Sequence, residues 1–190
     1  MKRIIAVTLI AYSSFLLSCK NTPVPIEEGF TSILADSTMN IQVTATNNQT
    51  YYEFGFKFQV LKDGKIAKLG TKLPNAGSYR VSIWDAKSKT VLLEKVVNQT
   101  QANKQHWVNI SLLPIIKDKE YLISVLANNW NDAFQKTGKA IEYPIEKGNI
   151  KLLRFAYTSQ PSSSSPPKFP NMTDNYYSIS GFVDFGFISN

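Results

Sequence analysis

Apolar and polar side chains alternate along this chain, and the alternation is strongest between residues 52 and 60. The apolar positions are Tyr52, Phe54, Phe56, Phe58 and Val60, and the positions between them are Glu53, Gly55, Lys57 and Gln59. A period of two predicts a β-strand with one buried face. The Asp63-Gly64 pair that follows is typical of a tight hairpin turn, so the segment predicts one arm of a hairpin.

Further runs rich in β-branched and aromatic residues recur at regular intervals, at residues 79–84, 90–97, 107–112, 121–126, 150–157 and 176–188. Turn-forming residues separate them, and no helical periodicity lies between them. This spacing predicts an all-β fold, an antiparallel jelly-roll-like β-sandwich that forms a single domain over residues 41–190. The last run needs partners from earlier in the chain, and we expect it to close the sheet.

Two polar stretches interrupt this rhythm. Residues 128–138 are polar and carry Trp130, which predicts a loop. Residues 159–170 hold four consecutive serines flanked by prolines. We expect this Pro/Ser-rich stretch to be a mobile surface loop.

The N-terminus has the layout of a secretory signal peptide over residues 1–18. A basic head is followed by an apolar stretch at residues 4–17, which is shorter than the ~20 residues that span a bilayer. The ending Leu16-Leu17-Ser18-Cys19 resembles the bacterial lipobox. That resemblance implies that Cys19 becomes the first mature residue and carries a lipid.

Cys19 is the only cysteine, so it has no internal disulfide partner. As an ordinary residue near a cleavage site it would be an exposed free thiol, and lipidation explains its presence better. We expect residues 19–40 to be the lipidated N-terminus and tether. In enteric lipoproteins an aspartate after the lipidated cysteine favours retention at the inner membrane. This chain has Lys20 there, and in this respect it resembles lipoproteins that are routed to the outer membrane. The expected location is therefore the cell envelope, lipid-anchored to the outer membrane.

Composition argues for a folded domain without a nucleic-acid partner. Hydrophobic residues make up 43% and aromatic residues 12% of the chain, which argues against disorder. The formal net charge is +7, and removal of Lys2 and Arg3 leaves +5. The lysines are scattered and form no basic run, so we expect no nucleic acid to bind. Attraction to anionic glycans or lipid headgroups is compatible with this charge.

Enzymatic residues do not form a recognisable pattern. His106 is the only histidine, and no local motif supplies the nucleophile and acid that a catalytic base needs. We interpret it as an exposed histidine at the start of a strand. We expect no catalytic residue, no cofactor and no metal site. Asp132 and Asp174 are the candidates for loop ligands if a calcium ion binds.

The three tryptophans have different expected roles. Trp84 leads from an apolar strand into a turn and is expected in the core or at its rim. Val108, Ile110 and Leu112 form the apolar face of the next predicted strand, and Trp107 lies on its other side. Trp107 is therefore expected on an outer face or folded over an end of the sheet.

Trp130 is the candidate ligand-binding residue, and four polar residues surround it: Asn128, Asn129, Asn131 and Asp132. An aromatic ring beside hydrogen-bonding groups suits a sugar, whose apolar face stacks while its hydroxyls find partners. The other interpretation is a loop tryptophan packed against the end of the sandwich, since large aromatic side chains usually bury most of their area.

Several short motifs recur in an order that resembles an uncharacterised bacterial β-sandwich module. They lie at residues 54–58, 77–85, 91–93, 107–110, 119–123, 175–177 and 183–185. The module is a domain of unknown function found in extracellular multidomain proteins, often beside carbohydrate-related domains. The resemblance covers about residues 52–187, implies that Trp84 and Trp107 belong to the framework, and brings no catalytic residues.

These observations together lead us to expect a membrane-anchored binding lipoprotein without enzymatic activity, with a glycan as its ligand. The alternative is a structural or adhesin-type subunit that docks on another cell-envelope protein. A hydrolase ranks third, because the dispersed carboxylates select no facing pair.

Overall fold

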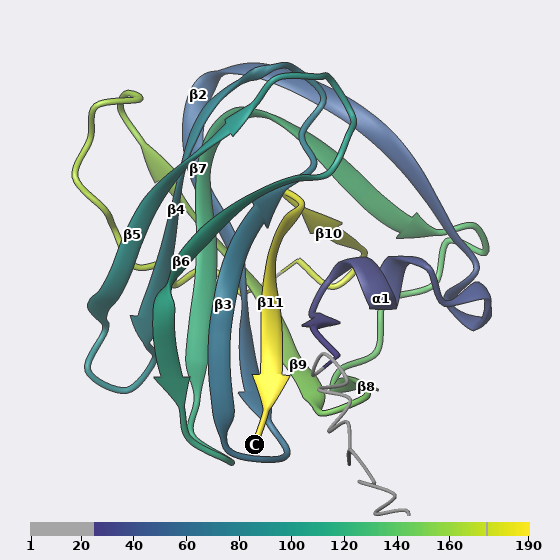
Figure 1. Ribbon diagram of the computed structural model, residues 1–190. Coiled ribbons are helices and arrows are strands. Elements are labelled where there is room, and N and C mark those ends of the chain that lie inside the picture. Colours follow the sequence, from purple (N-terminus) through teal and green to yellow (C-terminus); the bar gives the residue numbers. More distant parts are fainter. Residues whose placement is uncertain (1–24, 174) are drawn as a thin grey trace, which may run out of the picture.

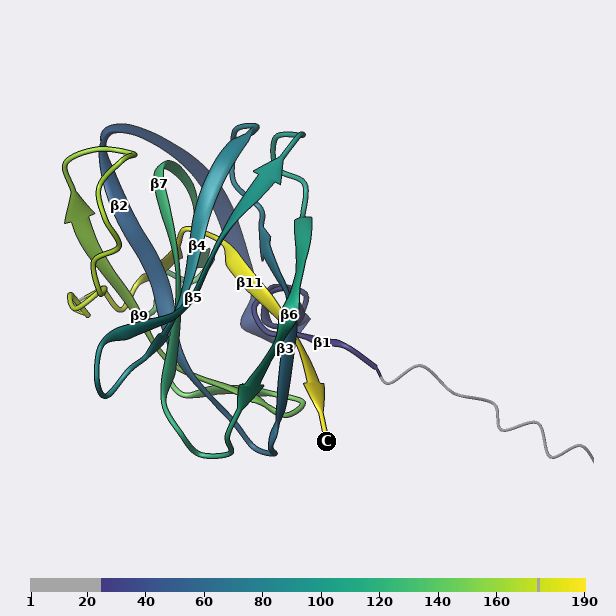
Figure 2. The same ribbon diagram turned by 60° about the vertical axis from the view of Figure 1, so that its left-hand side comes forward.

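The computed structural model describes residues 25–173 and 175–190, so the predicted signal peptide, Cys19 and Asp174 lie outside the described residues. Two antiparallel sheets pack face to face around one core (Figures 1 and 2). The prediction of an all-β, single-domain β-sandwich is confirmed. Within the described residues, no helix is long and apolar enough to cross a bilayer.

The smaller sheet has four strands and the larger has seven. The small sheet has the order β1 (Glu27–Glu28), β11 (Val183–Ser189), β3 (Gly64–Thr71) and β6 (His106–Ile115). The large sheet has the order β5 (Thr90–Gln99), β4 (Gly77–Asp85), β7 (Tyr121–Gln135), β2 (Ile41–Val60), β9 (Ile150–Gln160) and β8 (Ile145–Lys147). The short β10 (Ser178–Ser180) pairs with β7. The helical turns α1 (Thr31–Leu34) and η1 (Ser37–Met39) follow β1.

The alternation in β2 produces the core as predicted. Phe54, Phe56, Phe58 and Val60 are buried, and the ring of Phe58 lies 4.4 Å from that of Phe185 on the facing sheet. Each such side chain contributes about 1.5–3 kcal/mol through burial.

The predicted hairpin at Asp63-Gly64 is wrong, because β2 and β3 belong to opposite sheets. Asp63 instead bonds to the turn after β6 and to the last residue of the chain. Its Oδ1 accepts from the N–H of Lys117 (2.7 Å), and its backbone carbonyl accepts from the N–H of Asn190 (2.9 Å). The segment is therefore a crossover, held by contacts from distant parts of the chain.

The prediction of which side chains form the apolar face of β6 is only partly correct. Val108 and Ile110 pack against the core, but Leu112 is 54% exposed and Leu113 packs in its place. The register between β3 and β6 shifts at this point. Ile66 pairs with Leu113 and Lys68 with Asn109, so three residues of β6 lie opposite a single residue of β3. Such an irregularity interrupts the alternation of a strand locally, and the exchange occurs within it. Trp107 lies half-buried under the ammonium group of Lys68 (3.9 Å), on the outer face as expected.

The expected tether at residues 19–40 is too long, because the domain already includes the residues from Glu27 onward. Glu27 and Glu28 pair with β11, and Phe30 and Ile33 are buried in the core. The carboxylate of Asp184 accepts from the backbone N–H of Phe30 (2.7 Å) and of Thr31 (2.8 Å). The apolar side chains of this segment fill the core, so a tether can extend no further than residue 26.

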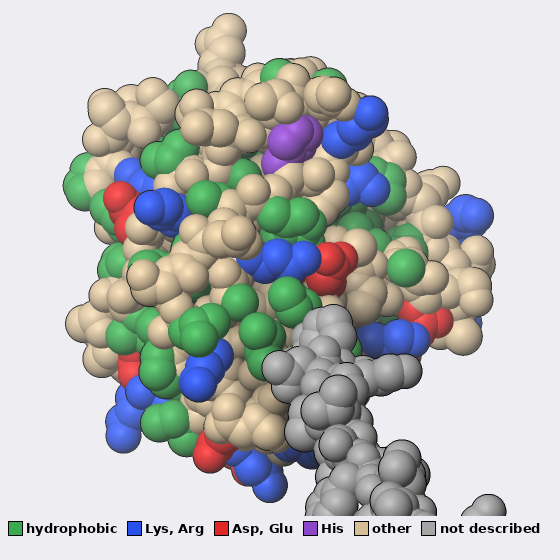
Figure 3. All heavy atoms as spheres, in the orientation of Figure 1, with side chains coloured by type: hydrophobic (Ala, Val, Ile, Leu, Met, Phe, Trp, Pro, Cys, Tyr) green, Lys and Arg blue, Asp and Glu red, His purple; other side chains and the backbone are tan. Residues whose placement is uncertain are grey.

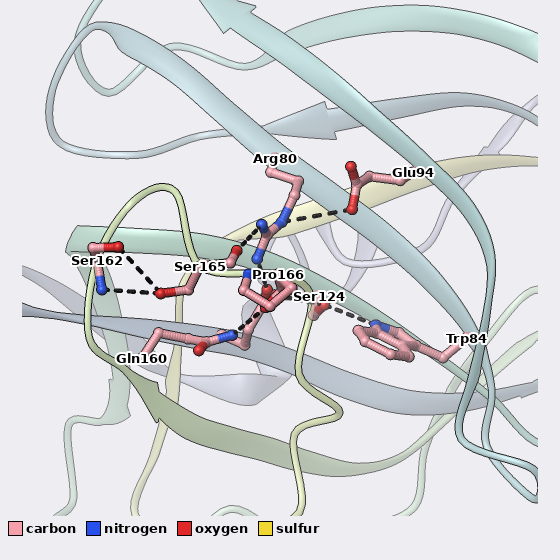
Figure 4. A network of polar contacts seen from close by, with 9 residues as sticks. Arg80, Trp84, Glu94, Ser124, Gln160, Ser162, Ser165 and Pro166 are labelled. Carbon is pink, nitrogen blue, oxygen red and sulfur yellow. Dashed lines mark hydrogen bonds and ion pairs between the residues drawn. The ribbon is translucent and has the colours of Figure 1, made fainter.

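The Pro/Ser-rich stretch was expected to be mobile, but it packs on the outer face of the large sheet (Figure 4). The side-chain amide of Gln160 donates to the carbonyl of Pro166 (3.0 Å), and the guanidinium of Arg80 donates to the carbonyl of Ser165. The ring of Phe169 contacts Trp84 edge-on at 5.6 Å. Trp84 is buried, in agreement with the prediction, but in a small cluster beneath this loop and outside the main core.

A buried ion pair lies under the same loop. Glu53 is fully buried and accepts from the guanidinium of Arg80 and from the hydroxyl of Ser124 (3.0 Å). The hydroxyl of Ser124 accepts in turn from the indole N–H of Trp84 (2.9 Å). The alternation places Glu53 on an outer face, and the loop removes that face from water.

Candidate functional site

An aromatic hollow of about 250 Å³ opens beside the second half of β7. We call it the aromatic hollow. The described residues that line it are Tyr52, Phe54, Trp130, Asp132, Phe134, Phe155, Tyr157, Asn175, Ser178 and Ser180. Two of them, Trp130 and Asp132, are predicted site residues. The hollow therefore contains part of the predicted site.

Residues 128–135 form a strand, so the predicted loop at 128–138 is wrong over most of its length. β7 runs to Gln135 and pairs with the first half of β2 on one side and with β10 on the other. This segment forms a strand despite its polar side chains, because the unusually long β2 supplies a backbone partner for each of residues 129–135.

An irregularity in β2 shapes the hollow. Asn47 pairs with Asn129 whereas Tyr52 pairs with Ala127, so β2 holds three extra residues at this point. Extra residues bend a strand and increase its local twist. In Figure 1, β2 and β7 curve away together beyond this point toward α1. Side chains from the two halves of the bent ladder consequently line one concave site.

Aromatic rings form most of the wall. The ring of Trp130 lies 4.7 Å from that of Phe54 and 5.6 Å, edge-on, from that of Tyr52. Phe155 and Tyr157 stack 5.9 Å apart on β9. Trp130 is only 9% exposed, so it is a wall residue that also belongs to the core. The expectation of a protruding platform is wrong, and the alternative of a tryptophan packed against the fold is closer to what the structure shows.

Asp132 supplies the charge in the hollow. Its Oδ2 accepts from the hydroxyl of Thr46 (2.9 Å) and from the indole N–H of Trp130 (3.0 Å), and its Oδ1 accepts from the hydroxyl of Ser180. All three donors are neutral. They fix the carboxylate in place without cancelling its charge.

The three asparagines predicted as ligand-binding residues do not line this hollow. Asn129 accepts from the hydroxyl of Tyr79 (3.0 Å), and the amide of Asn131 donates to the carbonyl of Lys72 (2.9 Å). Asn128 lies beside Asn129 and accepts from its amide (3.3 Å). Strand alternation sends Asn129 and Asn131 to the face opposite Trp130 and Asp132, so the five residues do not form one cluster.

Sequence reasoning missed the other lining residues. Tyr52 and Phe54 were identified only as core positions, and the serines of β10 carried no signal. β2 and β10 pair with β7, and β9 pairs with β2. These pairings bring the lining residues together with Trp130. Such pairing is non-local, and no pattern within a short window reports it.

Other candidate chemistry lies apart from the hollow. His106 is a half-buried residue at the start of β6, where its ring bonds the hydroxyl of Thr100 and the carbonyl of Lys104, each at 2.9 Å. Asp132 is the single carboxylate among the lining residues that the structure describes. No group of three or more His, Cys, Asp or Glu side chains gathers within the described parts of the chain. The calcium hypothesis also involves Asp174, which lies outside them.

Buried carboxylates elsewhere have structural partners. Glu53 pairs with Arg80 beneath the Pro/Ser-rich loop, and Asp184 binds the backbone of the N-terminal segment. Burial raises the pKa of Asp184 to about 6, and hydrogen bonds from backbone N–H groups oppose this rise. Neither carboxylate lies in the aromatic hollow, so neither faces Asp132 there as the second acid of a hydrolase.

Searches against protein-family models and against curated protein sequences find no match to this chain. The resemblance to an extracellular β-sandwich module therefore rests on the short motifs alone.

Proposed function

We propose that this protein is a membrane-anchored binding protein without enzymatic activity, and that its aromatic hollow holds a sugar ring of a glycan. The observation that carries this proposal is the combination, in one concave site, of aromatic rings with a fixed carboxylate acceptor. An apolar sugar face packs on aromatic rings, and sugar hydroxyls donate to a carboxylate.

The size of the hollow suits a single ring. Its volume of about 250 Å³ is below the roughly 300–1,000 Å³ typical of pockets for drug-sized ligands. Two serines and an asparagine at its edge, Ser178, Ser180 and Asn175, add further polar groups. One sugar unit of a longer glycan is the ligand that this arrangement favours.

The proposed lipid anchor determines how far the domain lies from the membrane. With a lipid on Cys19, the seven residues 20–26 separate the anchor from Glu27. Seven extended residues reach at most about 25 Å. The domain is then held close to a membrane surface in the cell envelope, where glycans of the same or of another cell are within reach.

A second candidate function is docking on another envelope protein. β5 and β6 are edge strands of the two sheets, and edge strands present unpaired backbone groups to a partner strand. They carry the exposed apolar side chains of Val91, Leu92, Val96 and Leu112. In Figure 3, hydrophobic side chains on this face of the molecule are interspersed with charged ones, so the apolar area is divided and we rank this function second.

An array of bacterial and host glycans, probed with the full-length protein in detergent, tests the proposal. We expect binding by the wild type and its loss in Tyr52→Ala, which removes one ring from the hollow. Tyr177→Ala is the matched control, because Tyr177 is 63% exposed and does not line the hollow. An array without binding by the wild type would overturn the proposal and place protein docking first.

A further inference from the structure

We infer that the aromatic hollow selects a sugar that carries a protonated amine. This inference rests on the proposed function and adds the chemical class of the ligand. Three features of the hollow support it: the uncancelled charge of Asp132, the aromatic rings around it, and the acceptor position that the carboxylate retains.

The charge of Asp132 is not neutralised by the protein within the described residues. Its three partners are two hydroxyls and an indole N–H. None of the described ion pairs includes Asp132, and no lysine or arginine is among the described lining residues. A carboxylate in a partly desolvated site favours a cation as its partner.

The aromatic rings reinforce this preference. Faces of tryptophan, tyrosine and phenylalanine rings attract cations within about 6 Å of the ring centre. Trp130, Tyr52 and Phe54 line the same hollow as Asp132, and Phe134 lies on the same strand as Asp132. A neutral sugar would gain only stacking and hydrogen bonds here. A sugar with an ammonium group would also interact with the ring faces and with the carboxylate.

The carboxylate has room for one more donor. A carboxylate offers about four acceptor positions. Among the described residues, Oδ2 accepts from two groups, Thr46 and Trp130, whereas Oδ1 accepts from Ser180 alone. An ammonium N–H can therefore donate to Oδ1 without breaking a bond that the structure contains.

A bare divalent cation is a poorer match. Calcium takes 6–8 oxygen ligands. Among the described lining residues, two side chains carry carboxylate or amide oxygens. They are Asp132, whose oxygens already accept three hydrogen bonds, and Asn175, whose Oδ1 accepts from two backbone N–H groups. The site satisfies a donor of hydrogen bonds better than it satisfies a metal.

Titrations of the full-length protein in detergent with glucosamine, glucose and N-acetylglucosamine test the inference. At mildly acidic pH, where the sugar amine is protonated, we expect glucosamine to bind at least about tenfold more tightly than either neutral sugar, the ratio that 1.4 kcal/mol gives. The preference should disappear at alkaline pH, where the amine of glucosamine is neutral.

Asp132→Asn is the decisive variant. The amide oxygen can still accept from Thr46 and Trp130, and the hydroxyl of Ser180 can turn to accept from the amide nitrogen, so the fold should survive. We expect this variant to bind glucosamine and glucose equally. Asp118→Asn, which changes an exposed carboxylate in a distant turn, should retain the preference.

Each contrary outcome has a separate meaning. Equal binding of glucose and glucosamine by the wild type, or an amine preference that persists in Asp132→Asn, would overturn the inference and leave sugar binding in place. Choline bound as tightly as glucosamine would show that the sugar ring contributes nothing, and would overturn the inference. Absence of binding to every sugar would overturn the proposed function, and the inference with it.

Discussion

The indole Nε1 of Trp130 donates a hydrogen bond to Oδ2 of Asp132 across 3.0 Å. The two residues lie on one face of β7, so the strand holds the largest ring of the hollow beside its only described carboxylate. The same ring packs on Phe54 in the core. Recognition and stability therefore depend on the same side chain, and this gives the first prediction.

Trp130→Ala should lower the free energy of unfolding by about 3–5 kcal/mol, the usual cost of truncating a large buried aromatic residue. Trp130→Phe should cost less, because it keeps an apolar ring and loses mainly the donor to Asp132. Urea unfolding monitored by circular dichroism measures both. A loss below about 1 kcal/mol for Trp130→Ala would show that the ring is not part of the core.

The ion pair of Glu53 and Arg80 gives a second prediction. Arg80→Met leaves a carboxylate buried without its cation, which should cost about 3–5 kcal/mol. The double variant Glu53→Gln/Arg80→Met should be destabilised by less than the sum of the single variants. Lys151→Met, which breaks the exposed pair with Glu146, is the control and should cost at most about 1 kcal/mol. Additive single effects would contradict a direct pairing.

The carboxyl of Asp184 predicts a pH dependence of stability. Burial raises its pKa in the folded state to about 6, and the unfolded chain has the ordinary pKa of about 3.9. A raised folded pKa means that this contribution to stability is complete below about pH 4 and is lost as the pH rises through 6. At about 1.4 kcal/mol per pKa unit, the free energy of unfolding should fall by roughly 3 kcal/mol across this window.

Asp184→Asn isolates that contribution, because the amide does not ionise and still offers one oxygen to the N–H of Phe30. Unfolding free energies measured between pH 4 and 7 should show a flatter slope for this variant than for the wild type. Hydrogen bonds from Lys147 and Lys119 lower the pKa of Asp36 and of Asp85, respectively, and both groups act alike in the two proteins. Parallel slopes would contradict the assignment to Asp184.

The loop cover predicts a spectroscopic change. Phe169→Ala removes the ring that packs edge-on against Trp84, so water should reach the indole and shift its fluorescence to longer wavelength. Protease digestion should cut the Pro/Ser-rich loop of this variant faster than that of the wild type. Tyr177→Ala, a change on the exposed surface, serves as the reference. An unchanged spectrum and unchanged cleavage would show that Phe169 does not hold the loop.

Lipidation of Cys19 is a prediction from the sequence alone. Cys19→Ser should release the protein from membranes and block acyl labelling, because no thiol remains to carry the lipid. Ser18→Ala keeps a small residue before the cysteine and should remain anchored. A Cys19→Ser protein that stays labelled and membrane-bound would contradict the anchor.

The sequence by itself determined the class of fold and most of its strands. Alternation along residues 52–60 identifies the buried face of β2, because successive side chains of any strand point to opposite faces. This property is local, so a single segment reveals it. Trp130 and Asp132 were also identified as site residues from the sequence, because they are close neighbours in a polar segment. Their position on one face of a strand was not predicted, because the segment was expected to be a loop.

Tertiary structure alone decided what surrounds those residues. Residues 128–135 look like a loop because they are polar, yet the long β2 supplies them with backbone partners. Glu53 reads as a solvent-facing position, but a loop more than a hundred residues later covers it. The sequence pattern predicts a tether for the N-terminal segment from Glu27, but Phe30 and Ile33 are buried in the core. Each of these outcomes depends on contacts between distant segments, whose free energies no local pattern of residues encodes.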